Sequence, residues 1–310
     1  MIGIDVGGAN LKVVDDDGVH VHYCPLWQGT PLVPLLEQYR HAGERAAVVM
    51  SGELADCFTD KQEGIAFIVD AVRQVFPDAI FYGNDAAFHA GPVPALAAAN
   101  WLAAADWLRE TYPSSMLLDV GSTTADIIPL SPFSVLKDLT DLQRLQNGYL
   151  VYTGMLRTPV TTLLSSVRLA GVETPVSTEY FATSADAHLI LGHIGVDSYT
   201  CDTPDRKEKT VEASRRRLAR VVCADLAEIG NAGVVTIAQA FWDRQRALVC
   251  GQVHRVLQES GATGVVTAGT GAALFADACG GTDLTKVLGP AADALPAFAV
   301  REVARRTRGN

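Results

Sequence analysis

The chain has 310 residues, of which 48% are hydrophobic and 19% are charged, and its formal net charge is −10. This length exceeds the usual size of a single hydrophobic core, so two domains are expected. The negative charge argues against a nucleic-acid partner, which calls for clustered Lys and Arg. It leaves a small phosphorylated ligand open, because a metal ion and local N–H groups can outweigh the global field.

Six cysteines stand at positions 24, 57, 201, 223, 250 and 279. They lack the spacing of a metal site, so we expect reduced thiols in a cytoplasmic protein. The first apolar run begins at Ile2, where a secretory signal would need a cationic segment. The most apolar stretch, 94–108, contains Asn100 and Asp106, so it predicts an Ala-rich packed helix and no membrane span. The sequence leaves open whether the chain forms a homo-oligomer.

The chain starts with an apolar strand that ends in an Asp, a Gly-bearing turn and a second apolar strand. Residues 2–14 have this pattern (IGIDVGGANLKVV), and it returns 114 positions later at residues 116–128 (MLLDVGSTTADII). Aligned without a gap, the copies pair Asp5 with Asp119, Gly7 with Gly121, Gly8 with Ser122, Asn10 with Thr124 and Lys12 with Asp126. The spacing is far too long for a solenoid repeat and indicates duplication of a whole α/β domain.

Gly-bearing turns that follow an Asp at a strand end are suited to bind phosphate and a metal ion. Glycine lets the backbone bend tightly and approach a ligand, and successive N–H groups in a turn bind anionic oxygens. An Asp at the strand end can hold hydrated Mg²⁺, which binds through one or two carboxylates plus phosphate oxygens. Two copies therefore predict two phosphate-gripping hairpins that face one ligand across a cleft. Two ordinary hairpins are the alternative, and the ungapped repetition disfavours it.

Strands and helices alternate through the first half, which favours an α/β layer structure. The patterns predict strands at 19–23, 46–50 and 79–82 and helices at 32–42 and 61–76. The strand at 79–82 runs into Gly83-Asn84-Asp85. A domain boundary is expected near residues 112–115, which gives a first domain over 1–113.

The second half predicts a domain over 114–290 and a C-terminal helix over 291–310 that packs back on the first domain. Residues 117–120 and 125–130 repeat the hairpin, and 205–229 and 232–259 are predicted helices. A strand from Gly264 leads into the turn Gly269-Thr270-Gly271 and a helix over 272–278. Ligands of open α/β sheets bind beyond the carboxyl ends of strands, where this turn, both hairpins and Asp85 are expected.

The motifs at 5–12, 119–126 and 268–271 together resemble the sugar kinase/Hsp70/actin superfamily. The resemblance implies two ribonuclease H-like, actin-like ATPase domains with an interdomain cleft, in which the hairpins bind phosphate and the third turn binds adenosine. Within the superfamily, the stretches at 50–56, 82–85, 119–129, 147–159 and 184–188 look like the hydantoinase/oxoprolinase-like branch.

Length and motif order resemble, more narrowly, a group tied to tetrahydromethanopterin-linked one-carbon metabolism and methanofuran biosynthesis. This resemblance implies a transferase that joins an aminomethyl-furanmethanol diphosphate to γ-glutamyl-tyramine, with release of diphosphate. Mg²⁺ is the implied cofactor, and a small phosphorylated molecule the substrate. ATP binding stays open, but no ATP consumption is expected.

The resemblance also implies roles for individual residues. Asp5 and Asp119 would hold Mg²⁺, and Lys12 would assist catalysis. Asp85 would deprotonate the phenol, and the alternative is a cap on a helix that starts at residue 86. The implied phosphate-binding residues are Gly7, Gly8, Asn10, Gly121, Ser122, Thr123, Thr124, Arg157, Gly269, Thr270 and Gly271.

Other residues are weaker candidates for the site. Glu53 is a lesser site candidate, and Asp126 either touches ligand or orients its loop. His188 and His193 are expected to be core or surface histidines, because their spacing suits no shared metal on a helix.

Two other functions remain open: an ATP-dependent small-molecule kinase or oxoprolinase-type ATPase, and a non-catalytic nucleotide-sensing ATPase. The case for a kinase is weaker because Ala87 stands where sugar kinases have a sugar-binding Asn. The second is weakened because the chain is short and carries no appended substrate domain.

Overall fold

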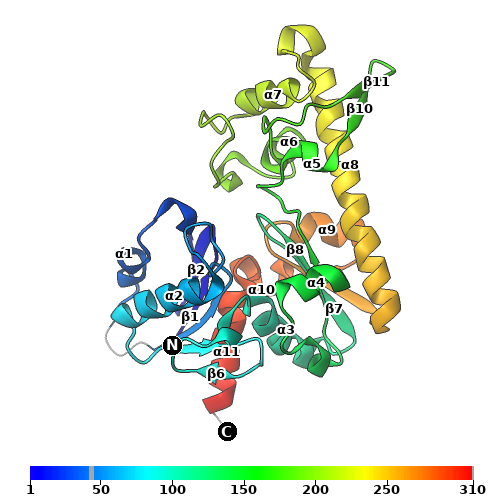
Figure 1. Cartoon of the computed structure of the whole chain (residues 1–310). Coiled ribbons are helices and arrows are strands. Elements are labelled where there is room, and N and C mark those ends of the chain that lie inside the picture. The colour runs from blue at the N-terminus through cyan, green and yellow to red at the C-terminus, as the bar shows by residue number, and fades with distance from the viewer. Residues whose placement is uncertain (42–44, 309–310) are drawn as a thin grey trace.

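The computed structural model describes residues 1–41 and 45–308. Two mixed β-sheets, two helices between them and a lobe above the second sheet make up the molecule (Figure 1). The expected α/β class is confirmed. Within the described residues, we find no helix with the length and apolarity needed to cross a membrane.

The first sheet has the strand order β3-β2-β1-β4-β5-β6. Its strands are β1 (Ile2–Val6), β2 (Asn10–Val14), β3 (Val19–Tyr23), β4 (Ala46–Met50), β5 (Ile80–Tyr82) and β6 (Phe88–His89). β1 to β3 form an antiparallel meander, β4 and β5 continue parallel to β1, and β6 runs antiparallel to β5. Helices α1 (Leu32–Glu37) and α2 (Lys61–Val75) pack on one face over Ile4 and Val48.

The second sheet has the order β13-β12-β7-β8-β9. Its strands are β7 (Ser115–Val120), β8 (Ala125–Pro129), β9 (Leu150–Val151), β12 (Gly264–Ala268) and β13 (Thr282–Asp283). β7 to β9 again form an antiparallel meander, and β12 and β13 continue parallel to β7. Strand order and direction thus repeat those of β1 to β5. The short helices that accompany the second sheet are α4 (Asp141–Asn147), α9 (Ala272–Cys279) and α10 (Thr285–Leu288).

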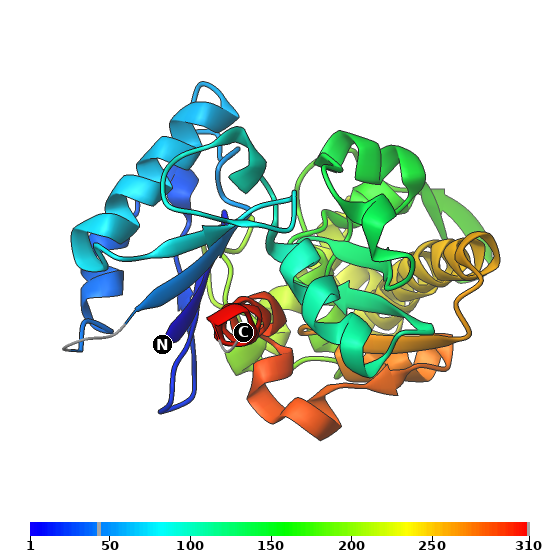
Figure 2. The same ribbon diagram turned by 90° about the horizontal axis from the view of Figure 1, so that it is seen from below.

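Two helices lie between the sheets, α3 (Asn100–Thr111) and α11 (Leu295–Arg308). Figure 2 shows α11, in red, end-on between the two halves. One apolar cluster joins Leu102 of α3, Leu117 of β7 and α11. Gly3 lets α11 approach β1, because a Cβ at Gly3 would lie 1.9 Å from the carbonyl oxygen of Ala297.

The lobe is inserted between β9 and β12 of the second sheet. It contains α5 (Val160–Leu163), β10 (Ser166–Leu169), β11 (Val172–Pro175), α6 (Ser184–Ile190) and α7 (Val211–Arg220). The long helix α8 (Leu226–Ser260) starts in the lobe and runs down along the second sheet (Figure 1). Gly230, with φ of 60°, marks a kink near the start of α8.

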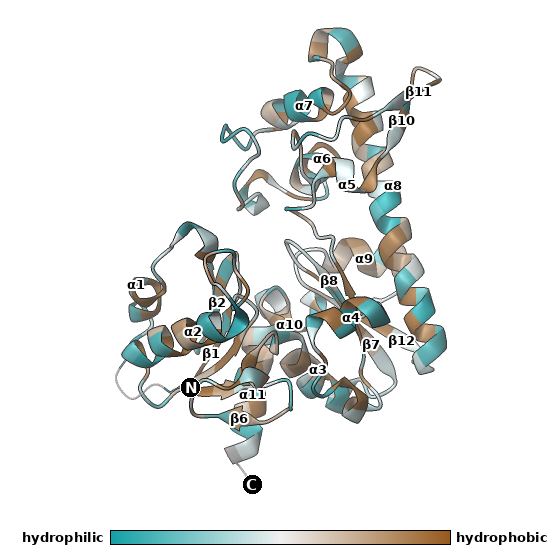
Figure 3. Cartoon of the chain, in the orientation of Figure 1, coloured by the Kyte–Doolittle hydropathy of each residue, from teal (hydrophilic) through white to brown (hydrophobic). Residues whose placement is uncertain are grey.

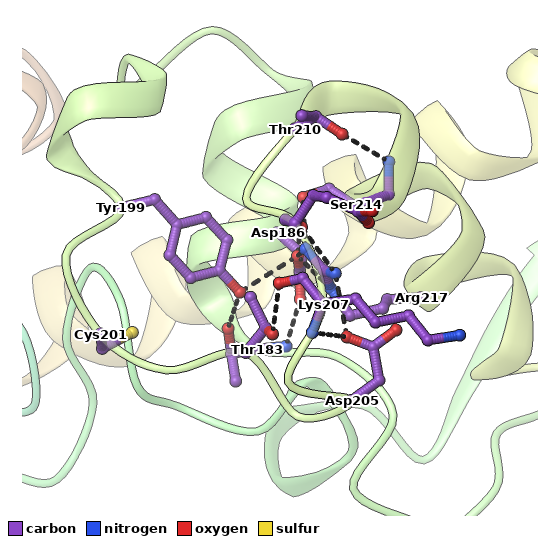
Figure 4. Close-up of polar contacts among 12 residues, drawn as sticks. Thr183, Asp186, Tyr199, Cys201, Asp205, Lys207, Thr210, Ser214 and Arg217 are labelled. Carbon is purple, nitrogen blue, oxygen red and sulfur yellow. Dashed lines mark hydrogen bonds and ion pairs between the residues drawn. The ribbon is translucent and has the colours of Figure 1, made fainter.

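An ion pair between two fully buried residues, Asp186 of α6 and Arg217 of α7, joins these helices of the lobe at 2.8 Å (Figure 4). Asp186 also accepts hydrogen bonds from the hydroxyls of Ser214 at 2.7 Å and Tyr199 at 3.2 Å, and Arg217 pairs with Asp205 at 3.2 Å. Buried charges persist when they are paired and hydrogen-bonded in this way. The network therefore fixes the 199–205 loop against α6 and α7.

The same loop reaches the first sheet. The Asp202 carboxylate accepts hydrogen bonds from the Tyr23 hydroxyl at 3.1 Å and from the Gln28 amide at 2.9 Å. In Figure 3, α7 is mostly teal, which reflects the many charged residues in its sequence. Asp202 is thus a polar contact between lobe and first sheet.

Several expected elements have different bounds. The helix expected over 32–42 ends at Glu37, and residue 42 lies outside the described residues. The helix expected over 94–108 is a 3₁₀ turn followed by α3. The helix expected over 205–229 is divided between α7 and the start of α8, because the chain turns at 221–225 between them. The final helix starts at Leu295 and not at 291.

Candidate active site

The two hairpins face one cavity of about 240 Å³. The first hairpin contributes Asp5, Gly7, Gly8, Asn10 and Lys12. The second contributes Asp119, Gly121, Ser122, Thr123, Thr124 and Asp126. Arg157 lines the same cavity. Most of the residues singled out in the sequence therefore meet at one place, although they are up to 152 positions apart, from Asp5 to Arg157.

Both turns have the same backbone closure. The N–H of Gly7 donates to the carbonyl of Asn10 at 3.0 Å, and the N–H of Gly121 donates to the carbonyl of Thr124 at 2.9 Å. Within the described chain, the N–H groups of Gly8, Ser122 and Thr123 find no acceptor. Adjacent unpaired N–H groups in a turn favour an anion, so both loops are suited to bind anionic oxygens.

A glycine from outside each hairpin packs against the turn. A Cβ at Gly52 would lie 2.9 Å from the carbonyl of Gly7, and a Cβ at Gly154 would lie 2.6 Å from backbone atoms of Ser122 and Thr123. No larger residue fits at either contact without moving the backbone. The segments after β4 and β9 therefore fix the shapes of the two loops.

The Asp residues of the two hairpins differ in exposure, because Asp5 is buried and Asp119 is half-buried. Asp5 is 5% exposed, and its Oδ1 atom is buried with no hydrogen-bond partner. Burial raises the pKa of Asp5 to about 6 and the pKa of Asp119 to about 7, while the Lys12 cation acts in the opposite direction. Burial thus disfavours the ionised form of both carboxyl groups.

The residues across from these carboxyls differ between the copies. Lys12 stands opposite Asp5, and its ammonium donates to the carbonyl of Asp293 at 2.8 Å. Asp126 stands opposite Asp119 and forms an ion pair with buried Arg144. Asp126 is therefore oriented by Arg144, and it also lines the cavity.

Arg144 is itself held from two sides. It pairs with Asp141 at 2.7 Å and stacks over the ring of Trp101 at 4.4 Å. Its charge is thus balanced by two carboxylates, and little of it is left for a ligand.

Arg157 differs from Arg144, because no carboxylate among the described residues balances its charge. Its guanidinium stacks over Trp27 at 4.4 Å and donates a long hydrogen bond of 3.4 Å to the hydroxyl of Thr123. Within the described residues it has no carboxylate partner. A half-buried guanidinium with unused donors in a cavity is suited to bind phosphate or carboxylate.

Asp85 does not line this cavity. It lies in the turn between β5 and β6, accepts the N–H of Ala87 at 3.1 Å and pairs with His89 at 3.0 Å. The alternative of a helix cap is wrong, because residue 86 starts no helix and β6 follows at Phe88.

The turn at Gly269, Thr270 and Gly271 does not line the cavity either. It lies directly behind Asp119, because a Cβ at Gly269 would be 2.3 Å from the Asp119 Oδ1 atom. Gly269 has φ of 78°, a left-handed conformation that glycine adopts without strain. In this structure the turn shapes the Asp119 wall of the cavity.

His188 is buried and neutral, as expected of a core histidine. Its Nδ1 lies 2.9 Å from Nδ1 of His193 and its Nε2 lies 2.9 Å from Oε1 of Gln245. Burial lowers the pKa of His188 to about 3. In the described part of the chain, no three His, Cys, Asp or Glu residues are grouped so that they could hold a metal.

Sequence reasoning missed several cavity residues. They are Ser51, Ala98, Asn100, Asp141, Arg144, Leu150, Tyr152 and Pro296, together with Trp27 through its contact with Arg157. The capping box of Thr140 and Gln143 marks the start of α4, which carries Asp141 and Arg144. That signal predicts the helix but not the cavity it borders.

One family model and two relatives of known name match this chain. The family model for hydantoinase/oxoprolinase matches residues 44–305. A protein of Methanocaldococcus jannaschii named (4-{4-[2-(gamma-L-glutamylamino)ethyl]phenoxymethyl}furan-2-yl)methanamine synthase is 37% identical over 290 residues, 90% of this chain and 88% of that protein. A protein of Methanococcus vannielii with the same name is 37% identical over 171 residues, 55% of this chain and 76% of that protein. The chain belongs to the hydantoinase/oxoprolinase family.

Proposed function

We propose that this protein is a transferase that joins an aminomethyl-furanmethanol diphosphate to the phenol of γ-glutamyl-tyramine, in the biosynthesis of a methanofuran-type cofactor. The observation that carries the proposal is the meeting in one cavity of two turns with unpaired N–H groups and two carboxyl groups with raised pKa values. A relative 37% identical over 90% of this chain has a name that describes the ether product of this reaction.

We further propose that the two sheets are duplicated ribonuclease H-like domains of the sugar kinase/Hsp70/actin superfamily. The identical order and direction of β1 to β5 and of β7, β8, β9, β12 and β13 support this. The repeated Asp-x-Gly turn at equivalent strand ends supports it independently. In this account the cavity is the interdomain cleft of the superfamily.

Asp5 and Asp119 are suited to hold Mg²⁺. The buried Oδ1 of Asp5 has no partner, and carboxylate oxygens are the ligands that this ion prefers. Two carboxylates suffice, because Mg²⁺ keeps waters and takes further ligands from phosphate groups. When bound, the ion neutralises charge that develops on the diphosphate.

The chain's own groups bind and orient the diphosphate. The free N–H groups of Gly8, Ser122 and Thr123 and the guanidinium of Arg157 supply preorganised donors. In the reaction, the bond between the furanmethyl carbon and the diphosphate oxygen breaks, and its electron pair stays on the diphosphate. Donors placed where this charge develops are usually the largest single contribution to catalysis.

The phenol oxygen forms the new bond to the furanmethyl carbon and gives up its proton. A free phenol has a pKa near 10, so a general base accelerates this step by roughly 10²–10⁴-fold. We propose Asp85 as that base. Asp85 does not line the cavity, but it follows β5 at the same edge of the first sheet as the end of β1, near which Asp5 lies, and this position supports the proposal.

A second candidate is an ATP-dependent kinase or oxoprolinase-type ATPase of the same fold. The resemblance, which expects an adenosine site at the Gly269 turn, supports it, although that turn packs behind Asp119 and does not line the cavity. The two candidates differ in whether ATP is consumed.

The test incubates the pure protein and Mg²⁺ with the furanmethyl diphosphate and γ-glutamyl-tyramine, with and without ATP. Ether and diphosphate are measured by mass spectrometry. We expect equal yields of both products with and without ATP. Product that forms only with ATP, together with ADP, would contradict the proposal in favour of the kinase.

A further inference from the structure

The second hairpin is held from behind by residues 153–158, which we call the backing segment. The N–H of Met155 donates to the carbonyl of Gly121 at 2.9 Å, and the next two N–H groups donate to the carbonyl of Ser122 at 2.9 and 3.0 Å. The last of these donors belongs to Arg157, which lines the cavity. The backing segment therefore determines both the position of the turn and the place from which the Arg157 guanidinium reaches the cavity.

The backing segment is in turn held by Gln245, a fully buried side chain of α8. The Gln245 amide donates to the Thr153 hydroxyl at 2.9 Å and to the Gly154 carbonyl at 3.0 Å. The Thr158 hydroxyl accepts the N–H of Gly154 at 2.9 Å and lies 3.0 Å from the Thr153 hydroxyl. Gly154, which packs directly against the turn, thus has its N–H and its carbonyl fixed by two buried side chains.

The hydrogen bonds of this network have one consistent direction, which we assign from the partners of each group. A carbonyl oxygen only accepts, so the Gly154 carbonyl fixes which end of the Gln245 amide faces it. The amide oxygen then faces Nε2 of His188 at 2.9 Å, and this nitrogen carries the proton. Nδ1 of His188 is left to accept from Nδ1 of His193 at 2.9 Å. Burial lowers the pKa of His188 to about 3, which keeps this ring neutral and the direction fixed.

The surroundings of Gln245 on α8 are otherwise apolar. About one turn away along the helix, Phe241, Trp242 and Val249 are buried in the apolar clusters. A buried amide among them costs free energy unless its polar atoms are paired, and here both ends of the amide are paired. Gln245 does not line the cavity. The amide therefore interrupts the apolar face of α8 at the backing segment, and it acts on a ligand through that segment.

We propose that Gln245 is a positioning residue for the diphosphate group of the substrate. The inference rests on the proposed function, in which the second hairpin binds that group. Gln245 fixes Gly154, Gly154 fixes the turn, and the backing segment places Arg157 beside it. The unpaired N–H groups and the guanidinium then converge on the diphosphate without reorganising when it binds. Thr158, which fixes Gly154 from the other side, has the same role.

The experiment uses two matched pairs of variants. Gln245→Met nearly keeps the size of the side chain and removes its hydrogen bonds. Gln239→Met is the control, because Gln239 lies exposed on the same helix and donates to Asp243 at 3.1 Å. Thr158→Val removes the hydroxyl and Thr158→Ser retains it, so this pair decides the question if Gln245→Met does not fold. The readouts are the Kd of inorganic diphosphate with Mg²⁺ by calorimetry, the Tm, and kcat and KM for both substrates.

Gln245→Met and Thr158→Val should raise the Kd of inorganic diphosphate by roughly 10- to 100-fold, as for misplaced groups at a binding site. The KM of the furanmethyl diphosphate should rise by a similar factor, whereas the KM of γ-glutamyl-tyramine should change by less than about threefold. Gln239→Met and Thr158→Ser should stay within about threefold of the wild-type Kd, because neither removes a bond of the network. A general loss of stability would lower the Tm without changing the Kd at temperatures well below it.

An unchanged Kd in Gln245→Met and Thr158→Val, together with a lowered Tm, would overturn the proposal and assign the network to folding alone. An equal rise of KM for both substrates would overturn it as well. If the wild type does not bind diphosphate, the anion-binding role of the second hairpin fails and the proposal fails with it. If diphosphate binds with the expected changes but no ether forms, the proposed reaction fails and the positioning role stands, because this binding requires no turnover.

Discussion

At the scale of single residues, burial makes the ionisation of Asp5 and Asp119 unfavourable. Asp5 lies near the end of β1 and lines the cavity, and burial raises its pKa from 3.8 to about 6. A raised folded-state pKa means that the group's contribution to stability is complete below about pH 4 and lost as the pH rises through about 6. Asp119 behaves in the same way up to about pH 7.

Asp5→Asn should therefore stabilise the metal-free protein at pH 8, by on the order of 1–3 kcal/mol, and leave it almost unchanged at pH 4. The same variant should lose activity, because an amide is a poor ligand for Mg²⁺. Thermal unfolding from pH 4 to pH 8, with EDTA and with Mg²⁺, measures both effects. In the wild type Mg²⁺ should stabilise the protein above pH 7 and have little effect at pH 5. A variant that is less stable than the wild type at pH 8 would contradict this account of Asp5.

Asp85→Asn tests the proposed base. We expect kcat to fall by roughly 10²–10⁴-fold with little change in the Kd of the diphosphate, because a base acts in the chemical step. His89→Gln is the companion variant, since His89 pairs with Asp85 at 3.0 Å. Full turnover in Asp85→Asn with a lowered Tm would show instead that the pair only stabilises the β5–β6 turn.

At the scale of elements, each hairpin depends on a glycine that lies elsewhere in the chain. Gly154 packs against the backbone of Ser122 and Thr123, and Gly52 packs against Gly7. These contacts also show what a sequence pattern can and cannot predict. Strand, turn and Asp recur locally, so both hairpins can be found from the sequence. The segments that contact the hairpins, which carry Gly52 and Gly154, are positioned by tertiary packing and give no local pattern.

Gly154→Ala should displace the second turn, because the new Cβ would meet backbone atoms at 2.6 Å. We expect a loss of stability of roughly 1–3 kcal/mol and a larger KM for the diphosphate. Gly251→Ala is the matched control, since it lies exposed in α8 with no atom within 4 Å of the added Cβ. That change should stabilise the protein by roughly 0.5–1 kcal/mol. Urea unfolding and steady-state kinetics compare the two variants, and equal behaviour would refute the packing argument.

Other elements show the limits of sequence reasoning more clearly. The helix expected over 205–229 breaks after Arg220, although no Pro or Gly marks the break before Gly230. Trp27 gives no local signal, because its role depends on Arg157 from the other half of the chain. Arg144 is recognisable as a helix residue, but its pairing with Asp126 depends on how α4 packs beside β8.

At the scale of the whole molecule, two sheets with the same strand order present the same turn to one cavity. α11 and α3 fill the space between the sheets, and Asp202 and Arg157 connect the lobe side to the first sheet. The duplicated pattern could be predicted from the sequence because it recurs without a gap. The lobe could not, because its apolar residues, such as Val160, Leu218 and Phe241, come together only in the tertiary structure, as does the buried pair of Asp186 and Arg217.

The central claim is that the phenol oxygen attacks carbon and the diphosphate leaves with its own oxygen. The most direct test uses γ-glutamyl-tyramine labelled with ¹⁸O in the phenol, together with unlabelled furanmethyl diphosphate, Mg²⁺ and no ATP. We predict that the ether retains the ¹⁸O and that the released diphosphate is unlabelled. Label in a phosphate product, or an ether without ¹⁸O, would contradict the account, because either result requires the phenol to react at phosphorus or to lose its oxygen.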